Sequence, residues 1–262
     1  MSCKIRKYRS LKAASTTNNS RVITILFVLI MIPAGLYLDS LSVSLIFPWG
    51  QTLANVVMIT TYLVIYKGAP RKLKKIMFYG LFIALAGEAL FSLVFGMYEY
   101  RLENIPVYVP PGHAIIYACV YYFVREPIVI RNQALIEKSL MAFAIIYGVF
   151  WLFYDNDLYG FICLLGLFAI YRYNRASGLF LLVMYTVVAY LEQVGTIYGC
   201  WYWPTIAFDS WAWLPSGNPP SAISIFYFAF DVVCIKIYLR LHKNTRFRLK
   251  RFQANFNAAA SE

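Results

Sequence analysis

Two glutamates stand inside long apolar stretches of this 262-residue chain, where ionisable side chains are rare. Glu88 and Glu192 each lie deep within a segment long enough to cross a membrane, and Asp231 lies in a third such segment. A charged group at the centre of a membrane costs roughly 3 kcal/mol on insertion scales, so it usually faces the protein interior and has a function. Desolvation favours the protonated form of a carboxyl group. We therefore expect the three acids to be catalytic, as general acids and bases.

The three acids lie at similar depths in their segments. Glu88 is about ten residues from the outer end of its segment, Glu192 about six and Asp231 about ten, which corresponds to about 15, 9 and 15 Å. All three could therefore line one cavity in the outer half of a membrane. Tyr227 stands four residues before Asp231, on the same helical face, and could hydrogen-bond it. The alternative is that each acid only anchors one helix to another.

Aromatic and polar residues that follow the acids are candidates for substrate binding. They are Tyr98, Tyr100, Arg101, His113, Trp201, Trp203, Asn218 and Tyr227. The tryptophans of segment 199–220 are also typical of an aromatic belt at the membrane surface, and His113 is typical of a headgroup anchor. Asn218 precedes two prolines, a pattern that also marks a turn before a helix. These alternatives stay open at the level of the sequence.

Several classes of site are excluded by what the sequence lacks. The two histidines, His113 and His242, are too few for the multi-histidine iron sites of membrane desaturases. The five cysteines are scattered singly, without the spacing of a zinc site or a disulfide framework. The chain has no phosphate-binding glycine loop and no serine-hydrolase elbow. We therefore expect no metal and no cofactor.

Eight apolar segments must position these residues. Apolar residues make up 61% of the chain and charged residues 14%, a balance far from that of soluble domains. A hydrocarbon core of about 30 Å needs about 20 apolar residues per helix. The expected transmembrane helices are 22–38, 49–66, 76–98, 110–125, 138–154, 157–173, 176–198 and 221–240. The second, fourth and sixth are the weakest candidates. The expected fold class is an all-α, polytopic membrane bundle of about eight helices.

The positions of lysine and arginine predict the orientation of this bundle. The formal net charge is +12, but the basic residues recur in short clusters between apolar segments, which argues against nucleic-acid binding. With the N-terminus inside, every one of the 24 basic residues except Arg101 falls on the cytoplasmic side. We expect a multi-pass protein of a prokaryotic cell membrane, with both termini in the cytoplasm.

The two halves of the chain resemble each other. Each half has a deep glutamate, then a glycine, two aromatic residues and a proline pair that opens the next helix. An even number of helices keeps both halves in the same orientation, so the pattern predicts a parallel repeat of four plus four helices, 1–126 and 127–262. Asp39 and Asp155, which follow the first and fifth helices, fit this division. Chance similarity between apolar helices is the alternative.

The first half also resembles a known family. Glu88 is followed by Gly96-x-Tyr98-x-Tyr100 and then by Ile105-Pro106-Val107-x-Val109-Pro110. This run resembles the membrane carotenoid-biosynthesis proteins that include the carotenoid hydratases, which have a helix glutamate, Gly-x-Tyr-x-Tyr and Val-Pro-x-x-Val-Pro. His113 stands where that family tends to have a tryptophan nearby. The resemblance implies addition of water to a terminal C=C bond of an isoprenoid, begun by protonation and without a cofactor.

Together these features predict an integral membrane enzyme that hydrates, cyclises or isomerises a C=C bond, as a lyase or an isomerase. Its substrate would be lipophilic, of the isoprenoid or carotenoid type, with Glu88 as proton donor and Glu192 as proton acceptor. Its other partners would be membrane lipids. Two alternatives remain, a proton-coupled transporter or lipid-binding membrane protein, and a structural subunit of a membrane complex.

Overall fold

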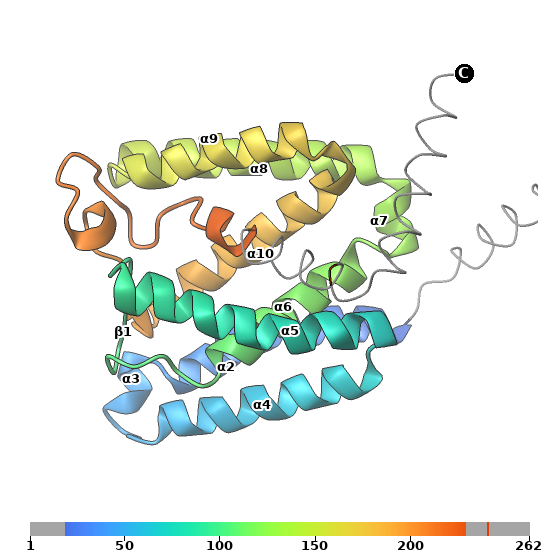
Figure 1. Cartoon of the computed structure of the whole chain (residues 1–262), viewed down its shortest axis with the longest axis horizontal. Helices are drawn as coiled ribbons and strands as arrows, with labels where there is room; N and C mark the ends of the chain where they lie inside the picture. Colours follow the sequence, from blue (N-terminus) through green and yellow to red (C-terminus); the bar gives the residue numbers. More distant parts are fainter. Residues whose placement is uncertain (1–18, 229–239, 241–262) are drawn as a thin grey trace, which may run out of the picture.

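The chain forms a helical bundle around one central helix. The computed structural model describes residues 19–228 and 240. Its longer helices are α2 (Asn19–Leu38), α4 (Gly50–Gly68), α5 (Arg71–Glu88), α6 (Val109–Phe123), α8 (Gln133–Tyr154), α9 (Leu158–Tyr173) and α10 (Gly178–Ile197). Short elements are α3 (Leu41–Ser44), η1 (Ala89–Val94), β1 (Glu99–Tyr100), α7 (Pro127–Arg131), η2 (Arg175–Ser177), β2 (Trp201–Tyr202) and η3 (Ala207–Asp209). Helix α6 packs against α2, α4, α5 and α10, while α8 and α9 form an outer layer beside α10 (Figure 1).

Four stretches of helix are long and apolar enough to cross a membrane. They are Arg21–Ser44, Arg71–Val94, Gln133–Tyr154 and Gly178–Ile197, and they correspond to the first, third, fifth and seventh expected helices. A helix satisfies its own backbone hydrogen bonds, which hydrocarbon requires. Large apolar side chains such as Ile30, Val94 and Phe153 are exposed on the surface of the bundle, as is typical of contact with lipid. The expected all-α fold is therefore confirmed.

The helices that carry the two glutamates end earlier than the sequence suggested. The helix expected at 76–98 is α5 continued by the π-helix η1, and it stops at Val94. Helix α10 stops at Ile197. In both cases a glycine with positive φ follows, Gly96 at 57° and Gly199 at 66°. Glycine adopts this left-handed conformation without the steric cost of a side chain, so it commonly terminates helices.

The last expected helix, 221–240, lies mostly outside the described residues. Residues 225–228 are helical and begin this segment. Asp231, expected to be the third catalytic acid, lies outside the described residues. Tyr227, which was expected to pair with it, is described and has another partner in the site.

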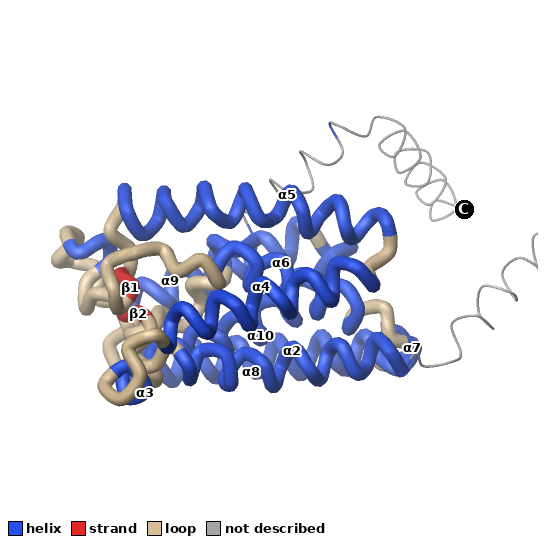
Figure 2. Tube along the Cα trace, turned by 90° about the horizontal axis from the view of Figure 1, so that it is seen from below, coloured by secondary structure: helices blue, strands red, loops and turns tan. Residues whose placement is uncertain are grey.

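The two ends of the bundle differ in composition. One end holds α3, the paired strands β1 and β2, and η3, while the other holds α7 and the connections from α4 to α5 and from α9 to α10 (Figures 1 and 2). Lys67, Arg71, Arg131 and Arg175 lie in elements at this second end. Arg101 follows β1 at the first end. The charge separation expected from the sequence is thus present along the long axis of the described part of the bundle.

Candidate functional site

Glu88 is buried at the end of α5, and three side chains hydrogen-bond its carboxylate. The hydroxyl groups of Tyr98 and Tyr100 both donate to Oε2, the latter over 2.6 Å. His113, near the start of α6, has its Nε2 2.8 Å from Oε1. The chain around β1 is extended, so alternate residues point to the same side and both tyrosines reach the same oxygen. The glutamate is only 3% exposed.

Glu192 is equally buried on α10 and is held in a similar way. The indole N–H groups of Trp201 and Trp203 both donate to Oε2, over 2.9 and 3.2 Å. The hydroxyl group of Tyr227 donates to Oε1 over 2.9 Å. Gly195 makes room for this arrangement, because a Cβ atom there would lie 2.0 Å from the Trp201 ring. Each glutamate therefore accepts two hydrogen bonds from the chain after its helix and one from the next helical segment.

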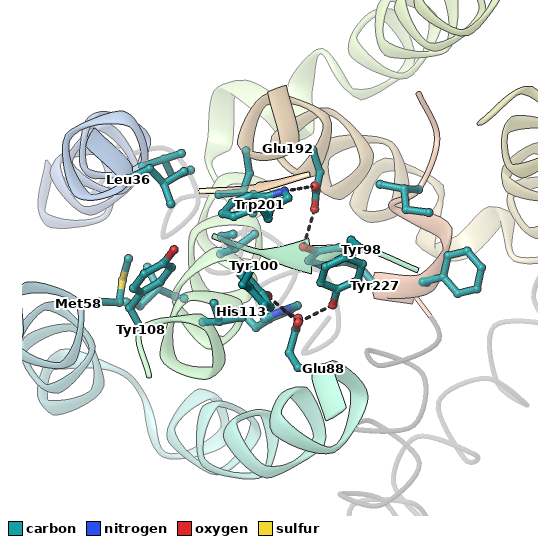
Figure 3. A pocket seen from close by; sticks show the side chains of 18 of the residues that line it. Leu36, Met58, Glu88, Tyr98, Tyr100, Tyr108, His113, Glu192, Trp201 and Tyr227 are labelled. Atoms are coloured by element: carbon teal, nitrogen blue, oxygen red, sulfur yellow. Dashed lines mark hydrogen bonds and ion pairs between the residues drawn. The ribbon is translucent and has the colours of Figure 1, made fainter. Parts of the chain in front are cut away.

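The two glutamate clusters meet through their aromatic rings. Glu88 and Glu192 approach from opposite sides, with the aromatic side chains between them (Figure 3). His113 stacks on Tyr227 with ring centroids 4.7 Å apart, and the Tyr98 ring lies 4.6 Å from that of Trp203. Strands β1 and β2 pair antiparallel, which brings Tyr100 opposite Trp201. Each of the three donors of one carboxylate thus lies against a donor of the other.

A cavity of about 80 Å³ lies against both clusters. Both glutamates and all six of their donors line it. Apolar side chains of α2 and α4 complete its wall, namely Val28, Met31, Ile32, Leu36 and Met58. In Figure 3, Leu36 and Met58 lie apart from the two carboxylates, so the cavity has a polar and an apolar side. Its described lining contains no lysine or arginine, which favours a largely apolar ligand with one reactive group near the acids.

Hydrogen-bond chemistry distinguishes the two oxygens of each glutamate. Burial and the nearby Glu88 carboxylate raise the pKa of Tyr98 and of Tyr100 well above that of an ordinary phenol, so both remain donors. Indole N–H groups can only donate, so Oε2 of Glu192 always acts as an acceptor. Oε1 of each glutamate has one hydrogen-bond partner where Oε2 has two, namely His113 in one cluster and Tyr227 in the other, so Oε1 is the better placed of the two oxygens to exchange a proton.

Arg101, expected to bind substrate, lies outside this cavity. Its Nη2 donates to Oδ1 of Asp39 over 2.5 Å, and its Nε donates to the Asp39 backbone oxygen over 3.0 Å. Tyr108 donates to the other carboxylate oxygen over 2.9 Å and also lines the cavity. Asp39 is fully buried. These contacts fasten the loop after β1 to the end of α2, which assigns Arg101 a positioning role.

A second buried aspartate fastens the chain that follows η3 to the start of α9. Asp157 accepts hydrogen bonds from the backbone N–H groups of Gly160, Gly217 and Ser221, the last over 2.6 Å. Asp155, the residue expected to match Asp39, is exposed. Asp157, two residues later, is the residue that caps α9 with its side chain.

The remaining candidates divide between the site and its support. Oδ1 of Asn218 accepts from the backbone N–H of Trp203 over 2.9 Å, so it positions that strand and does not line the cavity. The four tryptophans of the 199–220 loop do not act as one set. Trp201 and Trp203 are buried against Glu192, whereas Trp211 and Trp213 are exposed and stack on each other.

The sequence reasoning missed Tyr108 and the two buried aspartates as parts of the site's support. From the sequence, Asp39 was named only as fitting the division into two halves, and neither Tyr108 nor Asp157 was singled out. Within residues 19–228, no group of three or more histidine, cysteine, aspartate or glutamate side chains could hold a metal ion. No protein-family model, curated protein or solved structure matches this chain. The functional argument therefore rests on the geometry of the site.

Proposed function

We propose that this chain is a membrane enzyme that performs acid–base chemistry on a lipophilic substrate in the cavity between Glu88 and Glu192. One observation carries the proposal, namely that two buried carboxylates from different helices line the same largely apolar cavity. Paired acids in different surroundings are the usual means of dividing donor and acceptor roles.

The two clusters suit different roles. His113 can carry a proton on either ring nitrogen, so the His113–Glu88 pair is the proton donor. The indole and phenol donors around Glu192 all keep their protons near neutrality, so Glu192 itself is the group that accepts one. The stacked rings of His113 and Tyr227 keep the two groups adjacent. Asp231, if it contributes, would do so from outside the described residues.

The substrate would carry a C=C bond next to an apolar chain. Protonation of one carbon at the His113–Glu88 pair and removal of a proton at Glu192 balance without a cofactor. The second proton comes from a neighbouring carbon in an isomerisation or cyclisation, and from an added water in a hydration. The resemblance of residues 88–110 to carotenoid hydratases supports an isoprenoid substrate and a lyase or isomerase activity.

We further propose that the chain crosses a prokaryotic cell membrane eight times, with both termini in the cytoplasm. The end of the bundle that holds α7 and the clustered basic residues would face the cytoplasm, in keeping with the usual distribution of lysine and arginine. The seven long described helices match the first seven expected spans in order.

We also propose that residues 1–126 and 127–262 are parallel repeats. Glu99 pairs with Tyr202, and these residues occupy the same place in the two halves, as a two-fold axis would arrange them. The segment from Glu88 to its glycine is one residue longer than that from Glu192, and the π-helix η1 accommodates such an insertion. Buried aspartates fasten both loops.

Lipid profiles of cells test the proposed activity. Cells that lack the protein are complemented either with the wild type or with the Glu88→Gln, Glu192→Gln double variant. We expect the double variant to lose one lipid product and accumulate its precursor, as the deletion does. Unchanged profiles, with equal amounts of protein in the membrane, would rule out the enzyme. Proton-coupled uptake into vesicles that the same substitutions abolish would then favour the transporter.

A further inference from the structure

A second cavity lies deeper in the bundle, among α2, α6, α8 and α10. Its volume is about 470 Å³. The described residues that line it are Ile25, Leu29, Cys119, Val120, Phe123, Ile136, Leu140, Val183, Thr186, Val187 and Tyr190. The hydroxyl group of Thr186 already donates to the backbone oxygen of Leu182 over 3.0 Å. The described lining contains no charged side chain, so the cavity suits a hydrocarbon.

The two cavities follow each other along the same three helices. On α2, Val28 and Ile32 line the first cavity, and Ile25 and Leu29 line the second. On α6, Ile115 and Ile116 line the first, and Cys119 and Val120 line the second. On α10, Leu191 and Glu192 line the first, and Val187 and Tyr190 line the second. The step from one cavity to the next is two to four residues, or about 3–6 Å along each helix. From Glu192 to Val183, the far end of the second cavity is about 14 Å along α10.

We propose that the second cavity holds the hydrocarbon tail of the molecule whose reactive end lies between Glu88 and Glu192. This inference rests on the proposed function and deepens it, because it defines the substrate as a long single-chain lipid. The tail continues the apolar side of the first cavity along α2 and α10. Tyr190 at the edge of the second cavity is 40% exposed, so the cavity reaches the lipid-facing surface, where a tail can enter.

Photoreactive probes of different length test this proposal. The full-length protein in nanodiscs is irradiated with straight-chain alcohols, from hexyl to hexadecyl, that carry a diazirine on the terminal carbon, and the labelled residues are mapped by mass spectrometry. We expect the short probe to label first-cavity residues and the long probe to label Val120 and Val187. Labelling of the same residues by every chain length would overturn the proposal.

Two variants test whether the hydrocarbon in the second cavity is the substrate tail or a bilayer lipid. Val187→Phe fills the second cavity, and we expect it to lower long-probe labelling there about tenfold, because each buried methylene adds severalfold to affinity. Val64→Phe, on the exposed face of α4, is the matched control and should have no effect. Ile116→Trp obstructs the first cavity and should also abolish long-probe labelling of the second. If a diazirine phospholipid labels the second cavity equally with and without Ile116→Trp, its occupant is a bilayer lipid and the proposal is wrong.

These measurements report binding, so they are separate from the test of the activity. If probe labelling does not depend on chain length but the double variant changes the lipid profile, the proposed chemistry at the glutamates still holds. Unchanged lipid profiles combined with length-dependent labelling would instead identify a binding protein for long-chain lipids.

Discussion

The two glutamates differ in the chemistry of their hydrogen-bond donors. Glu88 is held by two phenols and an imidazole, while Glu192 is held by two indoles and a phenol. Indoles cannot accept a proton or give one up at accessible pH, whereas an imidazole does both near neutrality. In the proposed function, this difference, and not the depth of the acids, makes Glu88 with His113 the donor and Glu192 the acceptor.

Removal of one indole donor should destabilise the protein. In Trp201→Phe the carboxylate of Glu192 loses a hydrogen bond in a buried site, and we expect a loss of about 1.5–3 kcal/mol in the free energy of unfolding. Denaturant titration in detergent micelles measures it. Trp213→Phe is the matched control, with an expected change below about 0.5 kcal/mol, because Trp213 is 66% exposed. Equal losses in both variants would contradict the proposed role of the indole.

At the scale of elements, α5 and α10 present the acids while the strands and loops after them supply the donors. At Gly195 the Trp201 ring packs closely against the backbone of α10. In Gly195→Ala the added methyl group would displace the Trp201 ring, so we expect reduced thermal stability and loss of the product lipid. Gly80→Ala has open space around the new methyl group and should behave as the wild type. Wild-type activity in Gly195→Ala would show that the contact is not needed.

A separate prediction concerns the ion pair between Arg101 and Asp39. Arg101→Gln leaves the fully buried Asp39 without its cation, and we expect a loss of about 3–5 kcal/mol in the free energy of unfolding. Adding Asp39→Asn should recover part of that loss, because it removes the unpaired charge. Glu99→Gln, which weakens an exposed hydrogen bond to Tyr202, should cost less than about 1 kcal/mol in the same denaturant titration. A small effect of Arg101→Gln on the free energy of unfolding would contradict the positioning role of Arg101.

At the scale of the whole molecule, one end of the bundle is basic and the other carries the site and its aromatic loops (Figure 1). The proposed orientation predicts which end a membrane-impermeant maleimide can reach in intact cells. We expect Trp213→Cys to be labelled, and Arg131→Cys to be labelled only after the cells are permeabilised. The described native cysteines are buried, and Cys3 and Cys234, which lie outside the described residues, would be replaced by serine. Labelling of both positions in intact cells would contradict the orientation.

The sequence predicted which residues form the site better than it predicted which of them contact one another. The depth of Glu88 and Glu192 followed from helix boundaries alone, so their approach to one cavity could be expected. That Trp201 donates to Glu192 could not, because it depends on the turn at Gly199 and on close packing over Gly195. Arg101 also looked like a substrate contact until its partner, more than sixty residues earlier in the chain, was known. Long-range contacts of this kind leave no local pattern.

Deuterium exchange tests the central claim, acid–base chemistry at the two glutamates, without knowledge of the substrate. Lipids extracted from cells lacking the protein are incubated in D₂O with the purified protein in nanodiscs, and the products are analysed by mass spectrometry. We predict that one lipid species gains deuterium from solvent with the wild type and not with the Glu88→Gln, Glu192→Gln double variant. Identical deuterium incorporation in every lipid for the two proteins would contradict the account.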